Sequence, residues 1–377
     1  MRTWHRGFIA YSMLTFAVIF IYFFAVHAST LTVGNNAEFA RIQDAVDAAK
    51  SGDSVEVTNG TYFENVNIVK PITLKAIGKP VVDARGSYSA ITLSADGISL
   101  IGFNFTNSSG IGIMVKSNNN LISDNVAKKS SIGIWLETCS NNTVLRNIVF
   151  KNRESGISLQ RSNTNTLMSN KAEGNGDTGI ELEESDDNNV MENIVWNNSN
   201  DGIELKGAIN NTLKLNHAQE NKDGICLEEG SKNNNVSNND VIYNHIDGIL
   251  IRGSMGNAIS GNEISGNFNA MFLESSNENI LKENNITNNV DGIHLNYYCR
   301  GNKIYQNNLV NSSDYNAYDE SSNNQWYNGT TGNHYSDFDM PGKGCTDANG
   351  NGICDSAYII PGSQNRDKFA LISWNRL

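Results

Sequence analysis

The sequence predicts an all-β fold, a right-handed parallel β-helix of about ten rungs with an N-terminal capping helix. The main observation is a repeat of 22 to 23 residues, marked by two columns of asparagine. Repeats of this length are typical of solenoids, in which each turn stacks on the previous one. The first column is Asn120, Asn142, Asn165, Asn188, Asn211, Asn234, Asn257, Asn279 and Asn302. The second is Asn125, Asn147, Asn170, Asn193, Asn216, Asn239, Asn262, Asn284 and Asn307.

The second observation is a recurring Gly-Ile-x-Leu segment, as in Gly133 to Leu136. In a strand, alternation turns the isoleucine and leucine inward and the residue between them outward. A leucine-rich repeat has a similar period, but it usually adds a helical segment to each turn. Here the connecting residues are Asn, Ser, Gly and β-branched types, which favour turns and strands. We therefore expect three short strands per turn, with identical asparagine amides hydrogen-bonding from rung to rung and tolerating the left-handed bends.

An open stack of strands needs covered ends. Residues 37–50 carry apolar side chains at helical spacing, with Asn36 as the expected N-cap, so a capping helix is predicted there. Residues 29–90 are expected to hold this helix and the first irregular rungs, and residues 91–312 the regular repeats. Residues 313–377, rich in Trp and Tyr, are expected to form a C-terminal cap.

The N-terminus indicates export. Residues 1–28 hold two arginines, then an uncharged run and small residues at the end, as in a signal peptide. The run is also long enough for an uncleaved anchor, the one membrane contact expected. Without this segment the charge is 26 minus 40, or −14, which argues against nucleic acid as a partner. A secreted or cell-surface location follows, and ten N-x-S/T sequons permit glycosylation there.

Four carboxylates are predicted to share one face in the middle of the rod, two at the outward position of the Gly-Ile-x-Leu strands and two directly before the glycine. These candidate catalytic residues are Glu181, Asp201, Glu204 and Asp223. Stacked like charges about 5 Å apart cost about 1 to 3 kcal/mol, so a cation, a shared proton or a substrate is expected to compensate. The alternative is that aspartate before glycine only shapes a turn.

Four further outward residues are candidate carbohydrate contacts: Trp135, Phe272, Asp247 and His294. Exposed aromatic rings can stack against sugar rings, although they can equally cap the face by apolar contacts. Cys226 also points outward, and a lone thiol without a second cysteine or a nearby histidine is a weak metal signal.

The C-terminal segment contains a calcium-like loop. Asp347, Asn349, Asn351 and Asp355 offer alternating side-chain oxygens around glycines, as calcium ligands do. Cys345 and Cys354 bracket the loop, and an exported protein permits a disulfide between them. Position 358 is Tyr where an EF-hand places its bidentate Glu, so a non-EF calcium loop is expected. The alternative is a glycine-rich turn closed by the disulfide.

Several segments resemble the NosD-like, CASH-type parallel β-helix family, especially surface proteins of methanogenic archaea. The resemblance covers nearly all of residues 31 to 371 and implies the β-helix fold. The family includes sugar hydrolases, carbohydrate binders and a copper-site maturation factor. The matching segments are IQDAVDAAKSGDSVEV, GTYFENVNIVKPITL, the Gly-Ile-x-Leu repeats and the tail GNHYSDFD to GCTDANGNGICDSAYIIPG.

Three functions are therefore open: a non-catalytic surface protein that binds or packs among polysaccharides, a polysaccharide hydrolase or lyase using the acidic face, and a copper-site maturation factor. Rung lengths vary only between 21 and 24 residues, so no long loop indicates a catalytic cleft. This favours the non-catalytic function. No clustered His, Cys or Met supports copper, calcium is the one cofactor expected, and no organic cofactor is indicated.

Overall fold

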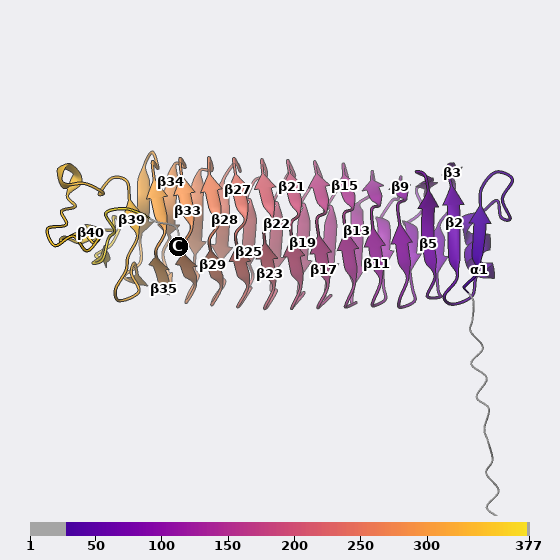
Figure 1. Ribbon diagram of the computed structural model, residues 1–377, viewed down its shortest axis with the longest axis horizontal. Coiled ribbons are helices and arrows are strands. Elements are labelled where there is room, and N and C mark those ends of the chain that lie inside the picture. The colour runs from indigo at the N-terminus through magenta and orange to yellow at the C-terminus, as the bar shows by residue number, and fades with distance from the viewer. Residues whose placement is uncertain (1–27, 375–377) are drawn as a thin grey trace, which may run out of the picture.

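The computed structural model describes residues 28–374 as a rod built from three parallel sheets (Figure 1). The fold is the predicted right-handed parallel β-helix. The expected signal segment lies, apart from Ala28, outside the described residues. Among the described residues no helix has the length and apolar character needed to span a bilayer.

Each sheet gathers one strand from every turn, so its neighbours in space are three strands apart in the chain. Sheet A contains β1 (Thr30–Val33), β2 (Ser54–Thr58), β5 (Thr73–Ile77), β8 (Ser99–Ile101), β11 (Leu121–Ser123), β14 (Thr143–Leu145), β17 (Thr166–Met168), β20 (Asn189–Met191), β23 (Thr212–Lys214), β26 (Asn235–Ser237), β29 (Ala258–Ser260), β32 (Ile280–Lys282), β35 (Arg300–Tyr305) and β38 (Asn323–Gln325). Sheet B contains β3 (Thr61–Tyr62), β6 (Val81–Asp83), β9 (Asn104–Thr106), β12 (Val126–Lys128), β15 (Ile148–Phe150), β18 (Lys171–Glu173), β21 (Ile194–Trp196), β24 (His217–Gln219), β27 (Asp240–Ile242), β30 (Glu263–Ser265), β33 (Asn285–Thr287), β36 (Asn308–Val310) and β39 (His334–Tyr335).

Sheet C holds the Gly-Ile-x-Leu strands, and the candidate catalytic residues lie on these strands or just before them. Its strands are β4 (Val66–Ile68), β7 (Ser89–Leu93), β10 (Ile111–Val115), β13 (Ile132–Glu137), β16 (Ile157–Gln160), β19 (Ile180–Glu183), β22 (Ile203–Lys206), β25 (Ile225–Glu228), β28 (Asp247–Arg252), β31 (Asn269–Glu274), β34 (Asp291–Leu295) and β37 (Tyr315–Asp319).

The predicted count of about ten rungs is too low. The three sheets contain 14, 13 and 12 strands, so the rod has about 13 turns and a length of roughly 60 Å. The extra turns come from the irregular N-terminal part and from residues 315–335, which continue all three sheets. The earliest turns carry none of the asparagines that reveal the repeat, so the spacing analysis passed over them.

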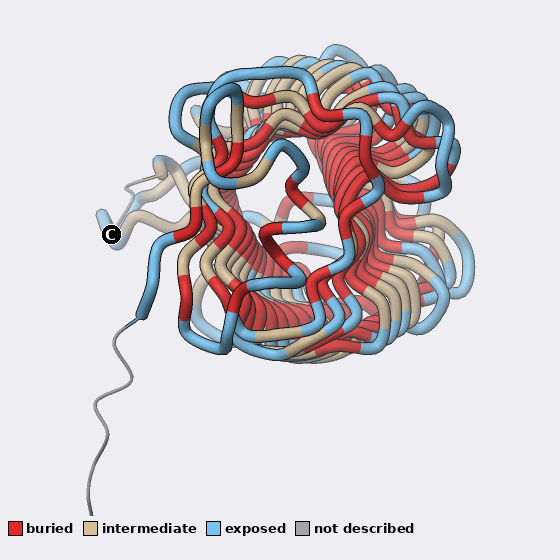
Figure 2. Tube along the Cα trace, turned by 90° about the vertical axis from the view of Figure 1, so that its right-hand side faces the viewer, coloured by how far each residue is buried: buried red, intermediate tan, exposed pale blue. Residues whose placement is uncertain are grey.

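The inward side chains form one continuous core along the rod. In a representative strand of sheet C, Ile134 and Leu136 are fully buried, as the alternation predicted. Figure 2, a view along the rod, shows buried residues on the inner wall of successive turns and exposed residues at the corners. Cys139 and Cys299 are buried in this core, as expected for small inward residues.

Asparagine ladders hold the corners. Each ladder Nδ2 donates to the Oδ1 of the asparagine one turn later, at 2.8 to 3.2 Å. The same Nδ2 often also donates to a backbone carbonyl, as Asn188 does to Ser162 at 3.0 Å. The sequence analysis identified two ladders and missed a third, at the corner between sheets B and C. The third ladder comprises Asn152, Asn175, Asn198, Asn221, Asn244, Asn267 and Asn289.

The proposed reason for asparagine at the bends was partly wrong. The ladder asparagines are absent from the left-handed region, and the residue before each of them occupies it instead, as Asn141 (φ 57°) does before Asn142. The ladder position is therefore selected by amide hydrogen bonding, whereas the position before it adopts positive φ with many residue types, including Arg146, Leu215 and Tyr243.

The N-terminal helix is shorter than predicted. It is α1 (Ile42–Ala48), it begins after Arg41, and Asn36 lies outside it with a φ of 62°. The cap comes from a distant residue, because the Glu64 carboxylate accepts hydrogen bonds from the Ile42 and Gln43 N–H groups at 2.8 and 3.0 Å. The helix still covers the first turn, as Figure 1 shows at the indigo end.

The C-terminal segment closes the other end with an aromatic core. Trp326 and Tyr335 are buried, and Tyr335 stacks on Tyr358 with ring centroids 3.8 Å apart. An antiparallel hairpin, β40 (Tyr358–Ile359) and β41 (Arg366–Asp367), and a short 3₁₀ turn at Pro341–Lys343 complete the cap. Because β37 to β39 extend the sheets, the cap proper begins near residue 336 rather than at 313.

We predict that Asn188→Ala lowers the free energy of unfolding by about 2 to 4 kcal/mol. The substitution removes the Asn188 Oδ1, which accepts from the Asn165 backbone N–H at 2.8 Å and its Nδ2 at 3.2 Å, and leaves these donors buried. Urea unfolding of Asn188→Ala and of Asn189→Ala, whose side chain is exposed, measures the effect. Equal midpoints for the two variants would show that the ladder contributes little.

Candidate functional site

Of the candidate catalytic acids, Glu181 and Glu204 lie on β19 and β22, Asp201 and Asp223 lie just before β22 and β25, and three of the four are closed to solvent. Asp201, Glu204 and Asp223 are only 2 to 3% exposed, and Glu181 is half-buried. Neighbouring rungs are so closely spaced that side chains above and below enclose each outward residue. The expectation of an exposed acidic face is therefore wrong for three of the four acids.

The structure gives these acids unequal surroundings. Glu204, on β22, receives a hydrogen bond from the Thr178 hydroxyl at 3.3 Å and an ion pair from Lys206 at 2.8 Å. Asp223 is held by Lys222 at 3.4 Å and by the Asp247 backbone N–H at 2.9 Å.

Asp201 and Glu181 differ in the hydrogen bonds that their carboxylates accept. The Oδ1 of Asp201 is buried without any hydrogen-bond partner, whereas Glu181 accepts from the Ser155 hydroxyl at 3.0 Å. Asp201 is thus the unsatisfied member of the four.

The cluster gains a sulfur ligand from the next turn. The register places Glu204 beside Cys226 of β25, and Cys226 is 1% exposed. Carboxylate oxygens of Asp201 and Glu204 and the Cys226 Sγ lie within 4.8 Å of one another. In the sequence Cys226 was only a weak metal signal, because the partners of this thiol come from a different turn.

Burial dominates the electrostatics of this cluster. It raises the pKa of Asp201, and the charges of Asp223 and Glu204 raise it further. Burial also raises the pKa of Glu204, against the lowering contact with Lys206. The sequence indicated only the cost of crowding like charges, whereas desolvation by burial is the larger cause of the raised pKa of Asp201 and Glu204. The Cys226 thiol has a pKa well above its ordinary value for the same reason.

The candidate carbohydrate contacts are not brought together as one set. Trp135 lies on β13 and Phe272 on β31, six turns apart, or roughly 29 Å. Phe272 instead packs edge-on against His294, with ring centroids 5.2 Å apart, and His294 packs against Tyr318 at 4.9 Å. Asp247 is 4% exposed. These side chains mostly cap the outer face of sheet C.

The predicted calcium loop exists as a compact turn closed by the Cys345–Cys354 disulfide. Asp347 accepts backbone hydrogen bonds from Gly350, Asn351 and Gly352 at 2.8 to 3.1 Å. Tyr358, at the EF-hand glutamate position, is buried in the cap and donates to Asp337 at 2.9 Å.

The other three candidate calcium ligands also accept hydrogen bonds from backbone N–H groups through their side-chain oxygens. The acceptors are Asn349, Asn351 and Asp355, at 2.9 to 3.0 Å. The side chains shape the loop, and calcium binding stays a prediction.

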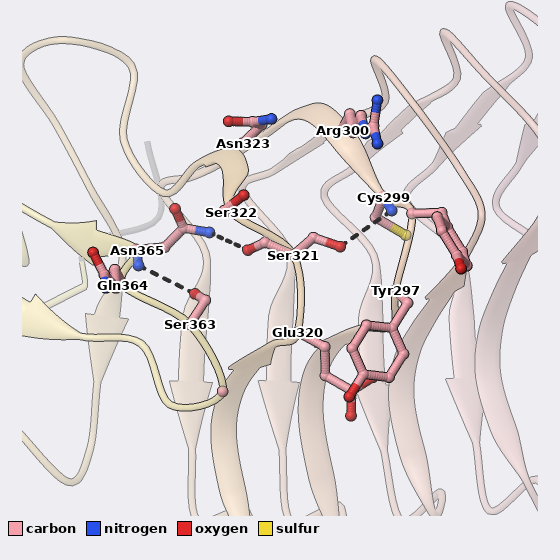
Figure 3. Close-up of a pocket in the computed structure, with 12 residues that line it drawn as sticks. Tyr297, Cys299, Arg300, Glu320, Ser321, Ser322, Asn323, Ser363, Gln364 and Asn365 are labelled. Carbon is pink, nitrogen blue, oxygen red and sulfur yellow. Dashed lines mark hydrogen bonds between the residues drawn. The ribbon is translucent and has the colours of Figure 1, made fainter.

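A groove that the sequence analysis missed lies at the C-terminal end of the rod. Its volume is about 580 Å³, within the range of small-molecule sites. Three turns of the chain form it: 297–299 between β34 and β35, 320–322 between β37 and β38, and 362–365 between β40 and β41. Figure 3 shows side chains from these three segments around one space.

The groove forms where the corner between sheets C and A changes length. Leu295 pairs with Asp319, and the Cys299 N–H donates to the Ser321 hydroxyl at 3.2 Å. Leu295 and Cys299 are four residues apart in one turn, whereas their partners Asp319 and Ser321 are two residues apart in the next. The corners of these two turns therefore cannot stack in register. Asn365 ties the hairpin to this corner by donating to the Ser321 carbonyl at 2.8 Å (Figure 3).

The groove combines aromatic and polar side chains. Tyr297 and Tyr298 are 61% and 74% exposed, and Arg300 and Glu320 supply one positive and one negative charge. The signal in the sequence was the drop in spacing between consecutive turns, from four residues (Leu295 to Cys299) to two (Asp319 to Ser321), which was not used.

Comparison with known families identifies one match. The family model described as periplasmic copper-binding protein (NosD) matches residues 46–247 and 208–340, more than half of the chain. No curated protein matches the chain by sequence.

Solved structures share the architecture at low identity. The A-module of mannuronan C-5 epimerase AlgE6 from Azotobacter vinelandii has 15% identity and a TM-score of 0.58, covering 76% of this chain and 93% of its own. A DFA-IIIase from Arthrobacter chlorophenolicus A6 without its lid has 13% identity and a TM-score of 0.57, covering 72% and 91%. The catalytic domain of a GH87 α-1,3-glucanase in complex with nigerose has 14% and 0.54, covering 76% and 65%. These likenesses show the fold alone.

We predict that Asp247→Asn stabilises the protein at pH 7.5 but not at pH 3.5. Burial raises the pKa of Asp247 to about 6, above its ordinary value, so the cost of its charge appears as pH rises from about 4 to about 6. The gain should approach about 3 kcal/mol as an upper bound. The Asn269 Nδ2, which donates to Asp247 at 2.7 Å, keeps an oxygen acceptor in the variant.

Urea unfolding at both pH values, with Asp187→Asn at an exposed position as the control, measures this effect. A gain that is the same at both pH values would contradict a titrating carboxyl group as its source.

We predict that calcium raises the melting temperature of protein pretreated with EDTA. A ligand that binds only the folded state stabilises it by about 2.7 kcal/mol at 100 times its Kd. Asp347→Asn should abolish the response, and Asp314→Asn, an exposed carboxylate elsewhere, should preserve it. Melting unaffected by calcium would leave the loop with a structural role alone.

Proposed function

The chain belongs to the NosD family, and we propose that it is an exported, non-catalytic β-helix protein that binds a polysaccharide segment in the C-terminal groove. The groove at residues 297–299, 320–322 and 362–365 carries this proposal. The family description as periplasmic supports a location outside the cytoplasm.

The chemistry of the groove suits sugars. Two exposed tyrosine rings, Tyr297 and Tyr298, offer flat apolar faces for the C–H faces of sugar rings. Hydroxyl and amide side chains of the groove can pair with sugar hydroxyls, as can Arg300 and Glu320. Two structurally similar proteins are named as a mannuronan epimerase and an α-1,3-glucanase, which supports a carbohydrate ligand.

The absence of a second acid in the groove favours binding over hydrolysis. Of the twelve residues that line it, Glu320 is the one carboxylate. Glycoside hydrolysis generally requires a pair of carboxyl groups flanking the scissile bond. The alternative is hydrolase or lyase activity at the mid-rod acids. It has weaker support, because Asp201, Glu204 and Asp223 are too buried to contact a polysaccharide.

The metal-ligating side chains that the structure brings together also give little support to a role in copper-site maturation. Among residues 28–374, one group brings three or more His, Cys, Asp or Glu ligand atoms together, and it contains one sulfur and no imidazole. Copper(I) favours thiolate, thioether and imidazole ligands. The two carboxylates of this group do not fit that preference.

We predict that Tyr297→Ala and Tyr298→Ala each weaken polysaccharide binding by roughly 3- to 10-fold, the loss expected for one stacked ring. A glycan array identifies the ligand, and titration calorimetry gives its Kd. Tyr243→Ala is the matched control, because Tyr243 and Tyr298 are both exposed and both have positive φ.

A reducing-sugar assay on the same ligand tests the non-catalytic part of the proposal. Any turnover by the unsubstituted protein, or an array without any bound glycan, would contradict the proposal.

A further inference from the structure

The strongest unassigned feature is the cluster of Asp201, Glu204 and Cys226, which is independent of the polysaccharide groove. All three side chains are at most 3% exposed. They come from two adjacent turns, Asp201 and Glu204 from one and Cys226 from the next. Among the described residues it is the one group with three His, Cys, Asp or Glu ligand atoms within 4.8 Å of one another.

Asp201 is the observation that points to a ligand. Its Oδ1 is buried and has no hydrogen-bond partner, although its carboxylate faces Glu204 and Cys226. Buried polar atoms nearly always have partners, so an unsatisfied carboxylate oxygen in a closely packed site requires an explanation. The nearby cations do not provide one, since Lys206 contacts Glu204 and Lys222 contacts Asp223.

The charge balance also calls for a cation. Asp201, Glu204, Asp223, Glu228 and Glu181 lie on this part of sheet C or next to it. Three cations contact these acids, Lys206, Lys222 and Arg252, and they neutralise only part of the five negative charges. A bound dication would supply the missing positive charge and occupy the free oxygen.

The donor set selects the type of metal. We propose that Asp201, Glu204 and Cys226 bind a zinc ion through two carboxylate oxygens and one thiolate. Zinc accepts oxygen and sulfur ligands in tetrahedral sites, with the fourth position left for water or another ligand. Ligand atoms in such a site are roughly 3.3 to 3.8 Å apart, and the three atoms already lie within 4.8 Å of one another, so side-chain shifts of about 1 to 1.5 Å suffice.

Zinc binding explains why a thiol occupies this buried position among carboxylates. Burial disfavours a free thiolate at Cys226, but a coordinating dication deprotonates a thiol outright. The proton leaves to solvent and the thiolate sulfur donates its electron pair to the metal. Hard cations such as calcium prefer all-oxygen sites, and copper(I) prefers softer ones, so the mixed set fits zinc better than either.

The test uses the full exported chain, stripped with EDTA and then equilibrated with zinc or with cobalt(II) as a spectroscopic probe. We expect one tightly bound zinc per chain and, with cobalt, a thiolate-to-metal charge-transfer absorption. Cys226→Ser and Asp201→Asn should each weaken zinc binding by at least roughly 100-fold, since even outer-shell losses cost 10- to 100-fold. The cobalt absorption should vanish in Cys226→Ser.

Cys139→Ser is the matched control, because Cys139 is also a buried free thiol but lies inside the core, in a column filled mostly by serines such as Ser162. It should retain zinc and the cobalt absorption. Asp201→Asn keeps the test decisive if Cys226→Ser does not fold. No retained zinc, zinc binding unaffected by either ligand substitution, or retention of copper without zinc would overturn the proposal.

Discussion

The structure depends on the hydrogen-bonded asparagine ladders that run along its corners. Each ladder amide in mid-rod is buried, donates to the next amide and accepts from the previous turn, as Asn188 does between Asn165 and Asn211. A corner would otherwise leave backbone N–H groups of each turn buried without partners, because the strands bend away from one another there. The ladder satisfies them, and it fixes the vertical spacing that lets all three sheets stay in register over about 13 turns.

This spacing also decides what the outer face of the rod can do. Side chains about 4.8 Å apart along the rod enclose one another, so outward residues in the middle of sheet C become buried. That is why Asp201 and Glu204 behave as interior carboxyl groups although they lie on the outer side of the rod, outside its apolar core. A regular stack is poor at presenting an open cleft, but it is good at bringing polar atoms from adjacent turns into a desolvated cluster.

The open groove occurs where the regularity fails. Between β34 and β37 the corner changes length, and the hairpin β40 to β41 folds back against it. The mismatch leaves a space that exposed tyrosines and polar side chains line. The proposed binding site and the proposed zinc site therefore have opposite origins, one in the break of the repeat and the other in its strict register.

The sequence by itself determined the repeating architecture. The spacing of Asn120 to Asn302 and the Gly-Ile-x-Leu alternation are local patterns, and stacking converts each into a column. It also predicted the disulfide between Cys345 and Cys354. Only the tertiary structure decided how far each outward residue is buried, that Cys226 joins two acids of the preceding turn, and that Glu64 caps α1. These features depend on the environment that one turn creates for the next and on contacts between residues about 20 positions apart in the chain. The residue types in one column of the repeat do not specify them.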